Sequence, residues 1–180
     1  STSIAAFIGL APKADAHVNE PWPVVNWTQF LNEFVGGSTN ATNLVHAVFG
    51  FFQNGGRRCY IVNLGDDGPI SGGGGRRGVA ALEAVDEVAM VAAPGYTNPE
   101  SYDDLLSHCE KMQDRIAILD APCEVRKLDL LTTVATPHVP GTPEPLERGL
   151  RPRMSDGGYG AFYFPCLLVR NPLVRGEQVI

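Results

Sequence analysis

The side chains that could perform chemistry are few and lie far apart in the sequence. Asp120 follows an apolar run at the place where a strand would end, and ligand sites of open α/β sheets gather at such ends. It could therefore supply a carboxylate to a small-molecule pocket. The alternative is an Asp-Ala-Pro turn in which the carboxylate accepts backbone N–H bonds. Because no second carboxylate or histidine lies beside Asp120, the turn is favoured.

Two basic or glycine-rich motifs suggest anion binding. Residues 72–75 are all glycine and precede Arg76 and Arg77, as in a phosphate-binding loop. The spacing G-x-x-x-x-G-K-[S/T] and its lysine are missing, and so is the dinucleotide fingerprint. We therefore expect a flexible surface loop. Arg57 and Arg58 could contact an anion or a partner, but a solvated pair at a strand edge is favoured.

Metal-binding and hydrolase patterns find no support. Of the acidic pairs, 66–67 lies in a glycine-rich loop and 103–104 near a helix start, so solvated roles are favoured. The histidines show no H-E-x-x-H spacing and the serines no G-x-S-x-G elbow. The residues concerned are His17, His46, His108, His138, Ser101, Ser107 and Ser155. We predict no catalytic, cofactor-binding or metal-binding residue, and no cofactor.

Composition limits the class of protein. The 180 residues suggest one domain, and the net charge of −6 argues against a dedicated nucleic-acid binder. No apolar run approaches the ~18 residues that cross a bilayer, and the start does not resemble a signal peptide. The four cysteines form no C-x-x-C pair, so we expect reduced, buried, cytosolic thiols. They are Cys59, Cys109, Cys123 and Cys166.

The apolar patterns predict alternating strands and helices around these residues. Strands are expected over 4–10, 59–64, 88–93, 116–119 and 159–169, the last bent at Pro165, and helices over 27–34, 41–54, 79–86, 99–114 and 124–134. Residues 11–25 are expected to form a loop, and 65–78 and 136–158 mobile loops, the second rich in proline. The order predicts a layered α/β domain over 1–180, with a mainly parallel or mixed sheet flanked by helices.

Local signals fix several helix ends. Asn40 or Thr42 can cap the helix over 41–54, and Gly55 supplies the left-handed residue that stops it. Asn98 caps the helix over 99–114, with Pro99 at its first position.

Six segments, in order along nearly the whole chain, resemble the contractile tail sheath family. The most specific is Phe-Phe-Gln-Asn-Gly-Gly-Arg-Arg-Cys-Tyr at 51–60. The segments are 3–13, 19–21 with 27–34, 47–64, 82–95, 108–110 with 114–122, and 159–165. The family includes sheaths of contractile phage tails, R-type pyocins and phage-like extracellular contractile injection systems.

The resemblance implies a structural protein and no enzyme. Such subunits stack as hexameric rings into a helical sleeve around an inner tube, and the sleeve contracts to drive the tube through a target envelope. The implied partners are further copies of the chain, the inner tube protein, and baseplate and terminator or cap proteins. Nucleic acid and direct membrane insertion are not implied. Assembly in the cytoplasm is implied, with the product a virion tail or a released phage-like particle.

The chain also departs from the family pattern. Sheath proteins carry an N-terminal arm before the position of Ser1 and a large C-terminal part beyond Ile180, so we expect an excerpt. The segment 136–158 is unlike the family, and Cys166 stands where an aromatic residue is expected. Two alternatives stay open: a small-molecule α/β enzyme with a pocket near Asp120, and a non-contractile adaptor module built on the same domain.

Overall fold

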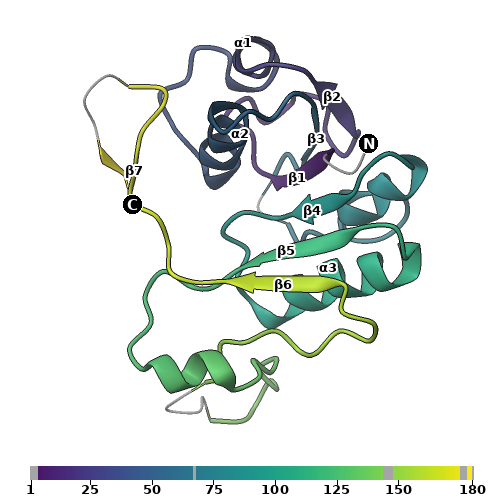
Figure 1. Ribbon diagram of the computed structural model, residues 1–180, viewed down its shortest axis with the longest axis vertical. Helices are drawn as coiled ribbons and strands as arrows, with labels where there is room; N and C mark the ends of the chain where they lie inside the picture. The colour runs from purple at the N-terminus through teal and green to yellow at the C-terminus, as the bar shows by residue number, and fades with distance from the viewer. Residues whose placement is uncertain (1–3, 67, 144–147, 175–177, 180) are drawn as a thin grey trace.

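A six-stranded mixed sheet forms the centre of the computed structural model, which describes residues 4–66, 68–143, 148–174 and 178–179. The strand order is β2-β3-β1-β4-β5-β6 (Figure 1). The parallel strands are β1 (Ala5–Gly9), β3 (Cys59–Asn63), β4 (Met90–Ala92), β5 (Ile116–Asp120) and β6 (Gly160–Tyr163), and β2 (Trp22–Val24) runs antiparallel at one edge. The predicted layered α/β class is confirmed.

Helices cover both faces of the sheet because its central strands are apolar on both sides. In β1, Ala6 and Ile8 contribute to one core, whereas Ala5 and Phe7 contribute to the other. The first core is covered by α3 (Pro99–Met112) and a 3₁₀-helix, η2 (Gly78–Ala84). The second is covered by α1 (Trp27–Phe30) and α2 (Asn43–Gln53). Figure 1 shows α2 and α3 on opposite sides of the sheet.

The predicted caps are present. Thr42 Oγ1 accepts a hydrogen bond from Val45 N at the start of α2, and Gly55 follows its end with a φ of 88°. At the start of α3, Asn98 Oδ1 accepts from Ser101 N at 2.8 Å, and Pro99 occupies the first turn. The sequence therefore sets the ends of both long helices through local polar contacts.

The region around residues 11–35 differs from expectation in two ways. The predicted loop over 11–25 contains β2, whose Pro23 pairs with Tyr60 at a sheet edge, where a missing N–H is tolerated. The helix expected over 27–34 continues as a π-helix, η1 (Leu31–Val35), closed by a hydrogen bond from Gly36 N to Leu31 O.

The later elements are shorter than predicted. The helix expected over 124–134 is only a 3₁₀-helix, η3 (Leu128–Thr132), none of whose residues is buried, so no packing stabilises a longer helix. The strand expected over 159–169 ends at Tyr163, and the Phe164–Pro165 peptide bond that follows is cis. Beyond it, β7 (Val169–Arg170) pairs with β8 (Gln178–Val179) in a separate two-stranded sheet.

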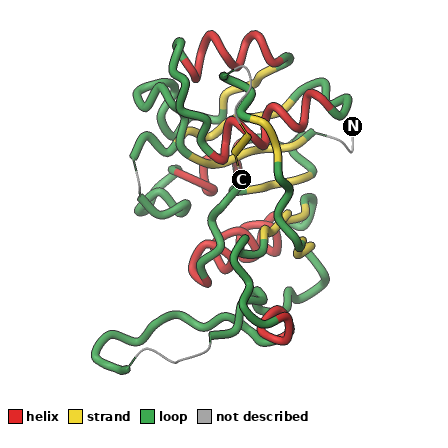
Figure 2. Tube along the Cα trace, turned by 90° about the vertical axis from the view of Figure 1, so that its left-hand side faces the viewer, coloured by secondary structure: helices red, strands yellow, loops and turns green. Residues whose placement is uncertain are grey.

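The two long loops, 65–78 and 136–158, differ in how they contact the rest of the molecule. The first, 65–78, is anchored at Ile70, which is fully buried, and at Gly78, whose N–H donates to Asn19 Oδ1. In the second, 136–158, residues 136–143 extend away from the rest of the molecule (Figure 2), whereas Arg153 is bound to Asp103 and Glu110 of α3. The mobility of both loops stays a prediction. In the described ranges, no helix is both long and apolar enough to cross a bilayer.

Candidate functional site

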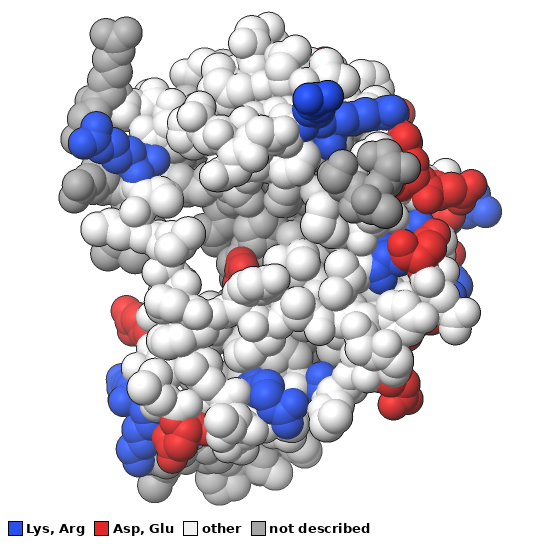
Figure 3. All heavy atoms as spheres, viewed as in Figure 1, with Lys and Arg blue, Asp and Glu red and all other residues white. Residues whose placement is uncertain are grey.

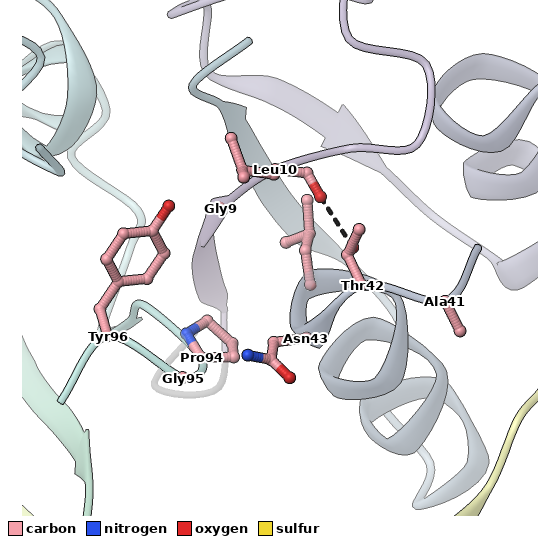
Figure 4. A pocket seen from close by; sticks show the side chains of 9 residues that line it. Gly9, Leu10, Ala41, Thr42, Asn43, Pro94, Gly95 and Tyr96 are labelled. Atoms are coloured by element: carbon pink, nitrogen blue, oxygen red, sulfur yellow. Dashed lines mark hydrogen bonds between the residues drawn. The ribbon is translucent and has the colours of Figure 1, made fainter. Parts of the chain in front are cut away.

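A crevice opens at the carboxyl ends of β1 and β4, between the two helical layers. The chain leaves β1 toward α2 on one face and β4 toward α3 on the other, which is where open α/β sheets bind ligands. The crevice has a volume of about 420 Å³ (Figure 4). Its lining residues are Gly9, Leu10, Ala41, Thr42, Asn43, Leu44, Pro94, Gly95 and Tyr96.

Tyr96 is the only one of these lining residues with an ionisable side chain. None of them is Asp, Glu, His, Lys, Arg, Cys or Ser. The Thr42 hydroxyl donates to Leu10 O at 2.7 Å, which joins the first turn of α2 to the end of β1. Asn43 lies against Gly95, and a Cβ on that glycine would come within 1.9 Å of Asn43 Nδ2. The polar groups of the crevice therefore join its two walls.

Asp120 closes the same edge of the sheet. Its Oδ2 accepts a hydrogen bond from Gly95 N at 3.1 Å, and its backbone oxygen accepts one from Tyr102 Oη at 2.6 Å. Burial, followed by the negative charge of Asp120, raises the pKa of Tyr102. The carboxylate thus accepts a backbone N–H bond, as the turn alternative expected, but the donor belongs to the turn after β4. Asp120 joins neighbouring strands and does not line the crevice.

The histidines are not brought together. His17 stacks on Trp22 with ring centroids 3.6 Å apart, and its Nε2 lies 3.2 Å from Glu33. His108 belongs to α3 and is buried, and desolvation lowers its pKa to about 4. Burial also lowers the pKa of His46. Among the described residues, no three His, Cys, Asp or Glu side chains are grouped so that they could hold a metal ion.

The acidic pairs have ordinary partners. Asp66 accepts from Gly68 N, and Asp67 lies outside the described residues. Asp103 is bound by Arg153. Asp104 is half-buried rather than solvated, and burial, assisted by Asp103 and Glu100, raises its pKa.

Arg57 and Arg58 have different surroundings. Arg58 forms an ion pair with Glu87 at 2.8 Å and donates to Tyr60 Oη, which in turn donates to Glu87. Arg57 is exposed beside a groove of about 610 Å³ whose lining includes Ile4, Phe51 and Met90. Figure 3 shows acidic and basic side chains intermingled at one edge of the molecule, with few charges over the middle of that face. This face has no continuous basic surface.

Arg153 fixes the proline-rich segment to α3. Its guanidinium donates to both carboxylate oxygens of Glu110 at 2.9 Å, to Asp103 at 2.6 Å and to Ser107. Hydrogen bonding from Arg153 lowers the pKa of Glu110 to about 2. A bidentate pair with two further acceptors is stronger than an isolated surface ion pair. The segment 150–158 therefore has one strong electrostatic anchor on the domain.

The expectation of four reduced thiols is wrong for two of them. Cys123 and Cys166 form a disulfide with a Cα–Cα distance of 5.2 Å. Sequence reasoning missed it because the cysteines are 43 residues apart and follow different strands, β5 and β6. Parallel pairing places those strand ends side by side, with Asp120 opposite Tyr163. Cys59 and Cys109 are free and buried, as expected.

The disulfide fastens an exposed apolar segment, residues 164–170, which we call the strap. The strap leaves β6 and runs past the carboxyl ends of the strands toward α2 (Figure 1). At its far end the buried Asn171 donates to Thr39 O, and Leu173 packs against the core beneath α2. Leu167 and Leu168 are 77% and 65% exposed. Such a run of exposed large apolar side chains is typical of an interaction surface.

Comparison with known proteins identifies the fold. No family model and no curated protein matches the chain. A chain in the cryo-EM structure of the anti-feeding prophage (AFP) helical sheath in the contracted state matches 96% of this chain with a TM-score of 0.58 and 17% identity. This chain has a sheath-like fold.

A second match agrees with the first. A chain in the AFP baseplate structure, also in the contracted state, matches 73% of this chain with a TM-score of 0.54 and 23% identity. The present chain covers 42% and 37% of the two matched chains, or about two fifths of their length. The resemblance predicted from the sequence is therefore confirmed at the level of the fold, and the matched proteins are components of a phage-like particle.

Proposed function

We propose that this chain is a structural part of a contractile sheath subunit. Copies would stack as hexameric rings into a helical sleeve around an inner tube, and contraction of the sleeve would drive the tube through a target envelope. The observation that carries the proposal is the match of 96% of the chain to a helical sheath protein. The chain would act by assembly and not as an enzyme.

The partners follow from that role. They are further copies of the chain, the inner tube protein, and baseplate and terminator or cap proteins, with assembly in the cytoplasm into a phage tail or a released phage-like particle. The exposed apolar side chains of the strap, which include Leu167 and Leu168, support contact with a second copy. An interface that repeats without closing generates a helix.

A non-contractile adaptor is the second candidate. It is favoured by the match to a chain of the AFP baseplate structure. An adaptor would bind one defined partner and form no filament. The small-molecule enzyme near Asp120 has less support, because Asp120 does not line the crevice and Tyr96 is the only ionisable side chain among the lining residues.

Electron microscopy separates these functions. We would express the full-length protein alone, concentrate it and image it in negative stain. Long hollow sleeves with a regular ring repeat are expected of a sheath subunit. Discrete particles at every concentration would contradict the proposal and favour the adaptor.

A matched pair of variants tests whether the strap forms the contact. Leu167→Ser with Leu168→Ser removes two exposed apolar side chains and is expected to abolish sleeves while leaving the fold intact. Leu128→Ser is the control, since Leu128 is 67% exposed and belongs to η3 rather than to the strap. Equal loss of sleeves in both variants would contradict a specific role for the strap.

A further inference from the structure

Both cysteines of the disulfide are accessible to solvent, whereas the two free cysteines are not. Cys123 and Cys166 are exposed residues at the carboxyl edge of the sheet. Cys59 and Cys109 are fully buried, and burial raises the pKa of each thiol to about 12. Thiol–disulfide exchange needs an attacking thiolate with access to a sulfur atom. Only a thiol from solution meets both needs at this bond, because the protein's own free thiols are buried and protonated.

The disulfide is a cross-link at the start of the strap, between anchors at its two ends. Before the strap, the sheet ends with a hydrogen bond from Ala121 N to Tyr163 O at 2.9 Å. After the strap, Asn171 binds Thr39 on the opposite half of the molecule. Between these anchors, the disulfide joins Cys166 directly to the chain that leaves β5. The neighbouring side chains of Leu167 and Leu168 are mostly exposed, so they bury little surface against the domain.

We propose that Cys123–Cys166 is a reversible redox site that exchanges with small-molecule thiols, glutathione among them, and fastens the strap only when oxidised. A thiolate attacks one protein sulfur, the S–S bond breaks, and the other cysteine leaves as a thiolate that takes up a proton. A second thiolate resolves the mixed disulfide. The protein gains two thiols and two molecules of thiol become one disulfide, so the two electrons come from the small molecule.

This site goes beyond the proposed function, but it has a consequence if that function is correct. A reducing cytoplasm would hold the strap released while subunits are made, and an oxidising exterior would fasten it in the finished particle. The strap would then be released while subunits are made and fastened by the disulfide in the finished particle.

The first test measures exchange in the folded protein. The oxidised full chain is incubated with reduced glutathione, alkylated without denaturant and mapped by mass spectrometry. We expect alkylation of Cys123 and Cys166, no reaction of Cys59 or Cys109 until denaturant is added, and an unchanged far-UV circular dichroism spectrum. A bond that resists glutathione in the folded protein, or a reduction that unfolds the domain, would overturn the proposal.

The second test measures release of the strap. Chymotrypsin should cleave after Leu167 and Leu168 at least tenfold faster in the reduced than in the oxidised protein. The variant Cys123→Ser with Cys166→Ser should be cleaved at the fast rate in either buffer, whereas Cys59→Ala should keep the response to reductant. Equal rates for oxidised and reduced protein would overturn the proposal. If the double variant does not fold, the cleavage rates of the oxidised and the reduced unmodified protein still test whether the strap is released.

Imaging separates this site from the proposed function. Sleeve formation is recorded for the oxidised and the reduced chain. Absence of sleeves in both states, with exchange and release as expected, counts against the sheath proposal and supports the redox site. Sleeves together with a bond that glutathione does not open support the sheath proposal and overturn the redox site.

Discussion

Removing the disulfide should lower the free energy of unfolding by about 4 kcal/mol. Cys123 and Cys166 are 43 residues apart, and the cross-link restricts that loop in the unfolded chain. For a loop of this length the chain-entropy model gives about 13 cal/mol/K, which is about 4 kcal/mol at 25 °C. A domain of this kind is stable by roughly 5–15 kcal/mol, so it should remain folded but become clearly weaker.

Urea unfolding measures this difference. Trp22 and Trp27 lie in or beside the second core and report unfolding by fluorescence. With a slope of about 2 kcal/mol/M, the midpoint of Cys123→Ser with Cys166→Ser should fall by about 2 M relative to the oxidised protein. The oxidised protein should also show the smaller slope, because its unfolded state is more compact.

Controls isolate the bond from the side chains. A phosphine reductant should lower the midpoint of the unmodified protein to that of the double variant, and it should have no effect on the double variant itself. A difference below about 1 kcal/mol between oxidised and reduced protein would refute the loop-entropy reasoning. An equal fall in the unfolding midpoint of the double variant on adding reductant would refute it as well.

Three further predictions concern buried groups and turns. His108 has a pKa of about 4 when folded and near 6.5 when unfolded, so the unfolding free energy should fall by up to about 3 kcal/mol between pH 6.5 and 4; urea titrations of His108→Gln should lack that slope. Arg153→Met should cost about 1–2 kcal/mol and speed hydrogen exchange across 150–158 but not across α3. Gly95→Val should lower the melting temperature more than Gly37→Val, because both glycines have a positive φ (81° and 82°) but only a Cβ at Gly95 would strike Asn43; equal losses would mean that backbone strain alone matters.

The sequence was sufficient where local signals act. The caps at Thr42 and Asn98 and the stop at Gly55 require contacts within a few residues, and all three are found. The buried strands were predictable because central parallel strands are apolar on both faces. The same logic missed β2, because a three-residue strand containing Pro23 carries the composition of a loop.

The rest depended on contacts between distant segments. An apolar spacing of three suggested a helix over 124–134, but Leu128 and its neighbours meet no core, and the helix is reduced to η3. The Cys123–Cys166 bond follows only from the neighbouring placement of β5 and β6, which spacing along the chain does not reveal. Only Cys123 follows the end of a predicted strand, whereas Cys166 lies within the strand predicted over 159–169, so the predicted elements did not place the two cysteines at one edge of the sheet.

The crevice shows why a favourable topology does not by itself create an active site. Strand order opens a gap beyond β1 and β4, and an enzyme would place ionisable side chains there. In this chain, the Thr42 hydroxyl donates to Leu10 O, the Asn43 side chain lies against Gly95, and Asp120 accepts a hydrogen bond from Gly95 N. The first hydrogen bond joins α2 to the end of β1, and the second joins the turn after β4 to the end of β5. The Thr42 hydroxyl and the Asp120 carboxylate are therefore occupied by backbone partners, and this arrangement accords with a structural role.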